Sequence, residues 1–110
     1  MLLPAGAQAI VDDAKLLDYV LNPEHPIGRH HAALFEHLLG ITRLNSGVLK
    51  DQLLRAAATV AVEAGRPSPF GEKFEMRFPV HGPAGSRQVL AVWIREYGFA
   101  PPRLITCYVE

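Results

Sequence analysis

Residues 72–80 read EKFEMRFPV, and their apolar side chains fall on every second position from Phe74 to Val80. Such an alternation is typical of a β-strand that buries one face and exposes the other. Two later segments also have strand character. RQVLAVWIRE, at 87–96, is apolar almost throughout, as a central strand would be, and RLITCYV follows at 103–109. Turn-rich links separate the three segments, so the sequence predicts an antiparallel β-meander.

The residues before this region follow a helical pattern instead. Apolar positions recur every three or four residues over 13–21, 29–39 and 45–64. GRPSPFG, at 65–71, separates a helical half (about 9–64) from a strand half (about 66–110) and leaves room for a fourth, edge strand near 67–70. The predicted class is α+β, a single domain with three N-terminal helices packed on one face of a three- to four-stranded antiparallel β-meander.

Alternation also predicts which side chains leave the core. With Phe74 and Met76 turned toward the helices, we expect Leu90, Val92 and Ile94 to point inward from the central strand. In the last strand we expect the same of Ile105, Cys107 and Val109. A one-residue error in register would reverse the faces of a strand. The open face of the sheet is then expected to carry Lys73, Arg77, Trp93, Arg95, Thr106 and Tyr108.

Composition narrows the class of protein. The chain has 110 residues, 49% of them hydrophobic, a formal net charge of +0 and one cysteine, Cys107. These values fit one globular domain, exclude an internal disulfide framework and provide no overall basic field for nucleic acid. No apolar run approaches the roughly 20 residues of a membrane span. We therefore expect a cytoplasmic protein with no membrane partner, and secretion by a signal-independent route stays open.

Four of the five histidines fall within NPEHPIGRHHAALFEHLLG, at 22–40: His25, His30, His31 and His37. Their spacing does not match the helical pairs, three or four residues apart, that zinc sites use, so we expect no metal and no other cofactor. His25 lies on the loop before a helix, and His30 and His31 lie in its first turn, where free N–H groups and Arg29 favour a phosphate. Two interpretations stay open. The histidines form an acid–base site, or they have no chemical role, with His31 packed partly under the helix and His37 in solvent.

Four stretches together resemble an uncharacterised bacterial domain family: LLDYVLNPEHPIGRHHAALF, GRPSPFGEKFEM, HGPAGSRQVLAVWI and PPRLITCYV. The resemblance covers about residues 9–109. It implies a domain found as small stand-alone proteins beside a small β-rich cognate partner, and at the C-termini of phage-type and polymorphic toxin proteins. Its layout is similar to the barnase–EndoU–colicin–RelE group of ribonuclease folds. The family has a lysine where this chain has His31, and a tyrosine where it has Phe70.

The resemblance implies a toxin-like, metal-independent ribonuclease in which the ribose 2′-OH attacks the adjacent phosphate of RNA. Such a reaction needs a base, an acid and cations for the developing charge. The candidate catalytic residues are His25, His31, Lys73 and Thr106. The candidate substrate-binding residues are Arg29, His30, Trp93, Arg95, Arg103 and Tyr108. The alternative is a non-enzymatic protein-interaction module, a toxin–antitoxin or immunity-like partner, that uses the same sheet surface as an interface.

Overall fold

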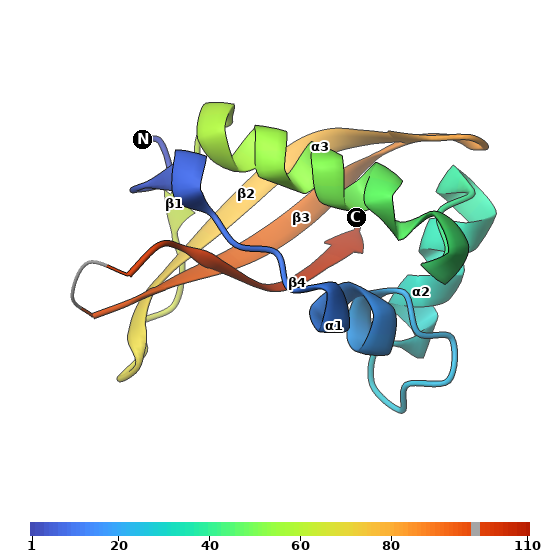
Figure 1. Ribbon diagram of the computed structural model, residues 1–110, viewed down its shortest axis with the longest axis horizontal. Helices are drawn as coiled ribbons and strands as arrows, with labels where there is room; N and C mark the ends of the chain where they lie inside the picture. Colours follow the sequence, from blue (N-terminus) through green and yellow to red (C-terminus); the bar gives the residue numbers. More distant parts are fainter. Residues whose placement is uncertain (98–99) are drawn as a thin grey trace.

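The computed structural model describes residues 1–97 and 100–110. Three helices precede a four-stranded antiparallel sheet whose strands lie in sequence order (Figure 1). The predicted α+β class is confirmed. The helices are α1 (Asp13–Lys15), which continues as a π-helical turn (Leu16–Val20), α2 (Arg29–Leu34), which continues likewise (Phe35–Leu39), and α3 (Ser46–Thr59). The strands are β1 (Glu63–Ala64), β2 (Gly71–Gly82), β3 (Gly85–Glu96) and β4 (Arg103–Val109).

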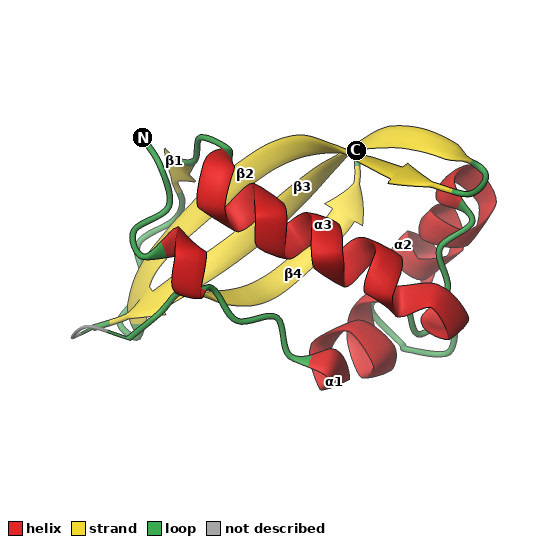
Figure 2. Ribbon diagram, turned by 45° about the horizontal axis from the view of Figure 1, so that its top comes forward, coloured by secondary structure: helices red, strands yellow, loops and turns green. Residues whose placement is uncertain are grey.

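The core lies between the helices and one face of the sheet. Figure 2 shows α3 crossing the strands on this face, with α1 and α2 toward one end of the sheet. Its largest fully buried side chains come from every layer and include Phe35, Leu49, Leu53, Met76 and Trp93. The N-terminal arm, residues 1–12, runs along the same side. Its Ile10 pairs with Arg103 of β4, and its Leu2 pairs with Ala61 near β1. The arm therefore reaches both edge strands of the sheet.

Two predicted boundaries are wrong, and strand pairing explains both. Helix α3 ends at Thr59 rather than near Ala64, because the chain becomes extended at Val60. The residues that follow pair instead: Glu63 and Ala64 form β1 against β2. Val60 and Val62 are β-branched and favour extended backbone, and Val62 is buried, so the segment gains more from the sheet than from another helical turn. The fourth strand is thus at 63–64, and not at 67–70.

The central strand faces the opposite way from the prediction. Phe74 pairs with Trp93, and Phe78 pairs with Val89. Directly paired residues of antiparallel strands point to the same face, so Trp93 and Val89 face the core. Leu90, Val92 and Ile94 consequently lie on the open face. A strand that is apolar on both sides carries no signal for its orientation, and the two-residue turn between Gly82 and Gly85 sets the register instead.

Strand β4 matches the prediction except at a bulge. Cys107 and Val109 are buried on the core face, as expected. The register shifts between Val92 and Trp93, so that Trp93 pairs with Leu104. Leu104 is therefore buried in place of Ile105, whose inward orientation was predicted. An extra residue in one strand changes which side chains face the core, and alternation alone does not reveal it.

Candidate functional site

The face of the sheet opposite α3, which we call the outer face, is crossed by three rows of paired residues. The rows are Lys73–Ile94–Arg103, Glu63–Glu75–Val92–Thr106 and Arg77–Leu90–Tyr108. These rows cross β3 at three apolar residues, Leu90, Val92 and Ile94. The three residues follow one another along β3 on the outer face, and we call them the apolar row. Leu90 is 5% exposed, whereas Val92 and Ile94 are half-buried. The outer face thus combines an apolar centre with charged and hydroxyl-bearing flanks.

One predicted pair of site residues meets at the edge of this face. The ring of His31, on α2, stacks on the ring of Tyr108, on β4, with centroids 4.8 Å apart and an interplanar angle of 30°. The Nδ1 atom of His31 is buried and has no hydrogen-bond partner among the described residues. Thr106 lies two positions before Tyr108, on the same face. Arg29 and His30 are exposed at the start of the same helix. The structure therefore gathers His31, Thr106 and Tyr108.

His25 has a structural role in the turn that leads into α2. Its Nδ1 atom accepts hydrogen bonds from the backbone N–H groups of Ile27 and Gly28, each 3.1 Å long. Its ring also meets the ring of Tyr19 edge-on, with centroids 4.8 Å apart. A ring nitrogen that accepts an N–H bond uses its lone pair and carries no proton. Nδ1 of His25 is therefore committed to the backbone in this conformation.

The rest of the NPEHPIG turn is held in the same way. Asn22 Oδ1 accepts from the Glu24 N–H at 3.0 Å and from Arg43 Nη1 at 3.3 Å, while its amide nitrogen donates to the Asp18 carbonyl at 3.1 Å. A Cβ on Gly28 would lie 2.8 Å from the Tyr19 carbonyl oxygen. Asn directly before Pro, followed by His and Gly, is a typical turn sequence, and these contacts show how its residues support the turn.

Other predicted site residues lie apart from this group. Trp93 is fully buried in the core with its Nε1 unpartnered among the described residues, so its predicted place on the open face is wrong. Arg95 shares the face of Trp93, also against prediction, and its Nε donates to the Ala100 carbonyl at 3.0 Å. Lys73 is on the outer face, as predicted, but four residues along β2 from the row of Tyr108, about 13 Å.

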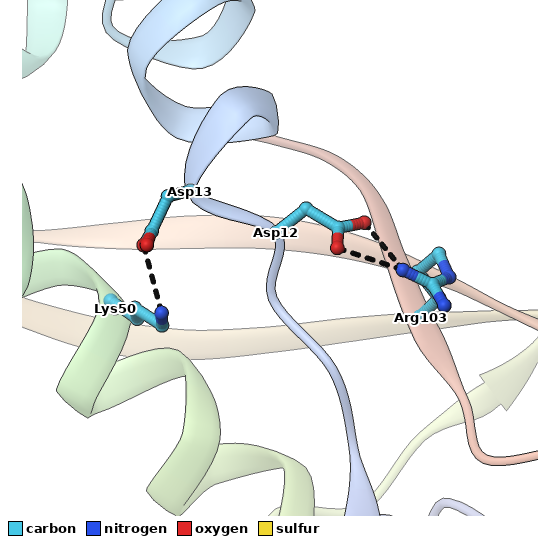
Figure 3. A network of polar contacts seen from close by, with 4 residues as sticks. All are labelled: Asp12, Asp13, Lys50 and Arg103. Atoms are coloured by element: carbon cyan, nitrogen blue, oxygen red, sulfur yellow. Dashed lines mark hydrogen bonds and ion pairs between the residues drawn. The ribbon is translucent and has the colours of Figure 1, made fainter.

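Arg103 is held by an ion pair. Its Nη1 donates to both carboxylate oxygens of Asp12, at 2.8 and 2.6 Å (Figure 3). The hydrogen bond to Asp12, and then the charge of that carboxylate, raises the pKa of Arg103 above its ordinary value. The neighbouring Asp13 pairs with Lys50 of α3 at 2.8 Å. The start of α1 is thereby tied to β4 on one side and to α3 on the other.

The charges beside β1 and β2 do not favour a polyanion. Arg77 pairs with Glu110 at 3.0 Å. The hydrogen bond to Glu110, together with the charges of Glu110, Glu75 and Glu63, raises the pKa of Arg77. Glu63 and Glu75 also pair directly across β1 and β2. Three carboxylates around one arginine leave this part of the outer face acidic, and acidic surfaces repel nucleic-acid phosphates.

The described part of the chain has neither a metal-binding cluster nor a membrane-spanning helix. No group of three or more His, Cys, Asp or Glu side chains among residues 1–97 and 100–110 could hold a metal ion. Within the same ranges, no helix is long and apolar enough to cross a membrane.

Cys107 is a buried free thiol, and its burial raises its pKa to about 12. Its inward orientation suits packing rather than nucleophilic chemistry.

Comparison with known proteins places the chain in a family. No curated protein and no solved structure shows significant similarity to it. The chain does match, over residues 2–110, the family described as a domain of unknown function, DUF6883. The expectation of an uncharacterised domain family is thus confirmed. Because the match extends over nearly the whole sequence, the chain belongs to the DUF6883 family.

Proposed function

We propose that the protein is a protein-interaction module that binds a partner through the outer face of its sheet. The observation that carries this proposal is the apolar row on the face opposite α3, of which Val92 and Ile94 are partly exposed and Leu90 is buried. Apolar residues framed by polar ones are typical of the centre of a protein interface. Tyr108 and Arg77 flank the row, and tyrosine and arginine often supply much of the binding energy.

The partner that fits this proposal is the small β-rich cognate protein that the family resemblance implies. An antitoxin or immunity-like pair would use such a face to hold the two proteins together. We expect the pair to act in the cytoplasm, where a free thiol such as Cys107 stays reduced. The acidic group of Glu63, Glu75 and Glu110 favours a partner surface that carries basic residues beside its apolar ones.

Binding of the purified product of the neighbouring gene tests this proposal. Val92→Glu places a charge at the centre of the outer face and is expected to weaken binding at least about 30-fold, the range of an interface hot spot. Ala58→Glu, at an exposed position on α3, is the matched control and should bind as the wild type does. Isothermal titration calorimetry measures the affinities, and circular dichroism confirms folding. The proposal fails if the wild type does not bind, or if Val92→Glu binds equally well.

A second candidate function is the toxin-like ribonuclease, which one observation favours. His31, Tyr108 and Thr106 gather at one edge of the outer face. There His31 would move a proton during attack by the ribose 2′-OH, and the hydroxyl groups would orient the phosphate. Arg29 and His30, exposed at the same helix start, would bind the RNA backbone. This ribonuclease site does not include Lys73, Trp93 or Arg95, because these residues lie away from His31, Thr106 and Tyr108.

An RNA-cleavage assay separates the two candidates. His31→Ala is expected to lower the cleavage rate at least about 100-fold if His31 transfers a proton. His37→Ala is the matched control, because His37 is an exposed histidine later in the same helical segment. Intact RNA after incubation with folded wild-type protein would remove the ribonuclease and leave the interaction module. Equal cleavage by wild type and His31→Ala would remove His31 as its catalytic residue.

A further inference from the structure

A cavity of about 370 Å³ opens between the turn after α1, helix α2 and the turn before α3. Its floor is apolar: Leu21, Ala32 and Ile41 line it, and each is at most 5% exposed. Ala32 and His31 are neighbours on α2, so their side chains diverge by about 100°. The cavity therefore lies on a different side of α2 from the contact with Tyr108. It is a surface feature separate from the outer face.

Two carboxylates stand at the rim of this cavity. Glu24 comes from the turn before α2, and Glu36 follows Ala32 by one helical turn. Both are exposed, and neither forms an ion pair with a described residue. Arg43 also lines the cavity, but one of its guanidinium nitrogens donates to Asn22 Oδ1. The rim thus has an excess of negative charge above an apolar floor.

The walls of the cavity are fixed by hydrogen bonds. In the turn before α3, Thr42 Oγ1 accepts from the Leu44 N–H at 3.2 Å, and Asn45 Oδ1 accepts from the Thr42 N–H at 2.7 Å. The Asn45 amide also donates to the Gly40 carbonyl at 2.9 Å. These bonds hold Leu44 at the cavity, where the residue is 99% exposed. A leucine kept entirely in water contributes nothing to the core and is available to a partner.

From these features we infer that the cavity binds a segment of a partner protein that presents an apolar side chain next to a lysine or arginine. The apolar side chain would occupy the floor of Leu21, Ala32 and Ile41, and Leu44 would cover it. The cation would lie between Glu24 and Glu36. A preformed cavity needs little ordering on binding, which favours a short, weakly structured peptide segment. The inference does not depend on the function proposed for the outer face.

Three blocked dipeptides serve as probes: acetyl-Leu-Lys-amide, acetyl-Leu-Gln-amide and acetyl-Leu-Glu-amide. Each is titrated into the full chain while NMR follows the signals of Leu21, Ile41 and Leu44. The lysine peptide is expected to shift these signals saturably and to bind about 5-fold more tightly than the glutamine peptide, the effect of one exposed ion pair. The glutamate peptide is expected to bind most weakly of the three.

Two substitutions complete the test. In the double variant Glu24→Gln, Glu36→Gln the lysine and glutamine peptides should bind equally, whereas Glu63→Gln, an exposed carboxylate on β1, should retain the preference. Leu44→Ser should weaken all three peptides alike. The inference is overturned if no peptide saturates at tens of millimolar, if the lysine and glutamate peptides bind equally, or if the shifts map away from the cavity.

Discussion

The two faces of the sheet come from the same strands, yet their side chains are used differently. On the core face, Phe74, Trp93 and Leu104 lie side by side across three strands and are almost fully buried. On the opposite face, Glu75, Val92 and Thr106 form a row that is half-buried at most. Glu75 and Val92 are one residue away from Phe74 and Trp93 along their strands, whereas Thr106 is two residues from Leu104 because of the bulge. The comparison teaches that register, and not residue type, decides whether an apolar or aromatic side chain here is structural or available to a partner.

The histidine cluster shows the same contrast. His25 and His31 are six residues apart, but the first is hydrogen-bonded within its own turn and the second lies against the edge of the outer face. Nδ1 of His25 has two donors, whereas Nδ1 of His31 has no partner among the described residues. The spacing of histidines in the sequence does not distinguish these two environments, because each depends on what packs against the ring.

The largest loss of stability is expected on the core face, and truncating one residue on each face measures the contrast. Trp93→Ala should lower the free energy of unfolding by about 3–5 kcal/mol, because it empties a fully buried position. Val92→Ala, one residue along, should cost about 1 kcal/mol or less, because Val92 is partly in water. Urea denaturation of the two variants measures both values. Similar losses would contradict the assignment of the two faces.

The buried thiol of Cys107, on the core face, makes the free energy of unfolding depend on pH. Burial raises the pKa of Cys107 to about 12. In the unfolded chain the thiol ionises near pH 8.5, so between these values the folded state holds a proton that the unfolded state loses, and stability falls as pH rises. The loss between about pH 8 and about pH 10 should be about 2 kcal/mol.

Cys107→Val is the control for this pH effect, since other titrating groups act equally in both proteins. The difference in unfolding free energy between wild type and Cys107→Val should shift by that amount over the same interval. A difference that does not change with pH would mean that the thiol is open to solvent in the folded state.

The same substitution at both histidines sharpens their contrast. His25→Phe should lower the free energy of unfolding by about 1–2 kcal/mol, because two backbone N–H groups lose their acceptor. His31→Phe should be neutral or slightly stabilising, because phenylalanine keeps the stacking on Tyr108 and removes an unpartnered buried nitrogen.

Thermal denaturation of the two phenylalanine variants, with His25→Asn as a partial rescue, measures these effects. Asparagine supplies a side-chain oxygen that accepts bonds at a helix start. Equal destabilisation at positions 25 and 31 would contradict the separation of their roles.

A small, salt-sensitive loss of stability is expected at the edge of the outer face. Asp12→Asn should cost less than about 1 kcal/mol, because its ion pair with Arg103 is exposed and solvent screens it. The loss should shrink further at high salt. Chemical denaturation of wild type and Asp12→Asn at two salt concentrations tests this expectation. A larger, salt-independent loss would show that the pair holds the N-terminal arm more firmly than an exposed contact does.

Much of the fold was accessible from local patterns. The alternation from Phe74 to Val80 predicted β2 and its buried face, and the helical pattern over 29–39 predicted α2 together with the helical turn that continues it. These features depend on neighbours in sequence, and local periodicity reports them directly. The candidate site was less accessible. His31, Thr106 and Tyr108 were predicted residues that proved to be close together, but Asn22 and Gly28 were not recognised as supports of the turn around His25.

The sequence by itself determined the α+β class, the order of helices and strands and the faces of β2, because each follows from short-range periodicity. The tertiary structure decided the face of β3, the burial of Trp93 and the bulge that buries Leu104. It also decided that Glu63 and Ala64 join the sheet. A strand that is apolar on both sides can satisfy either orientation, and pairing with its neighbours removes that ambiguity, because one register places all inward side chains in the same core.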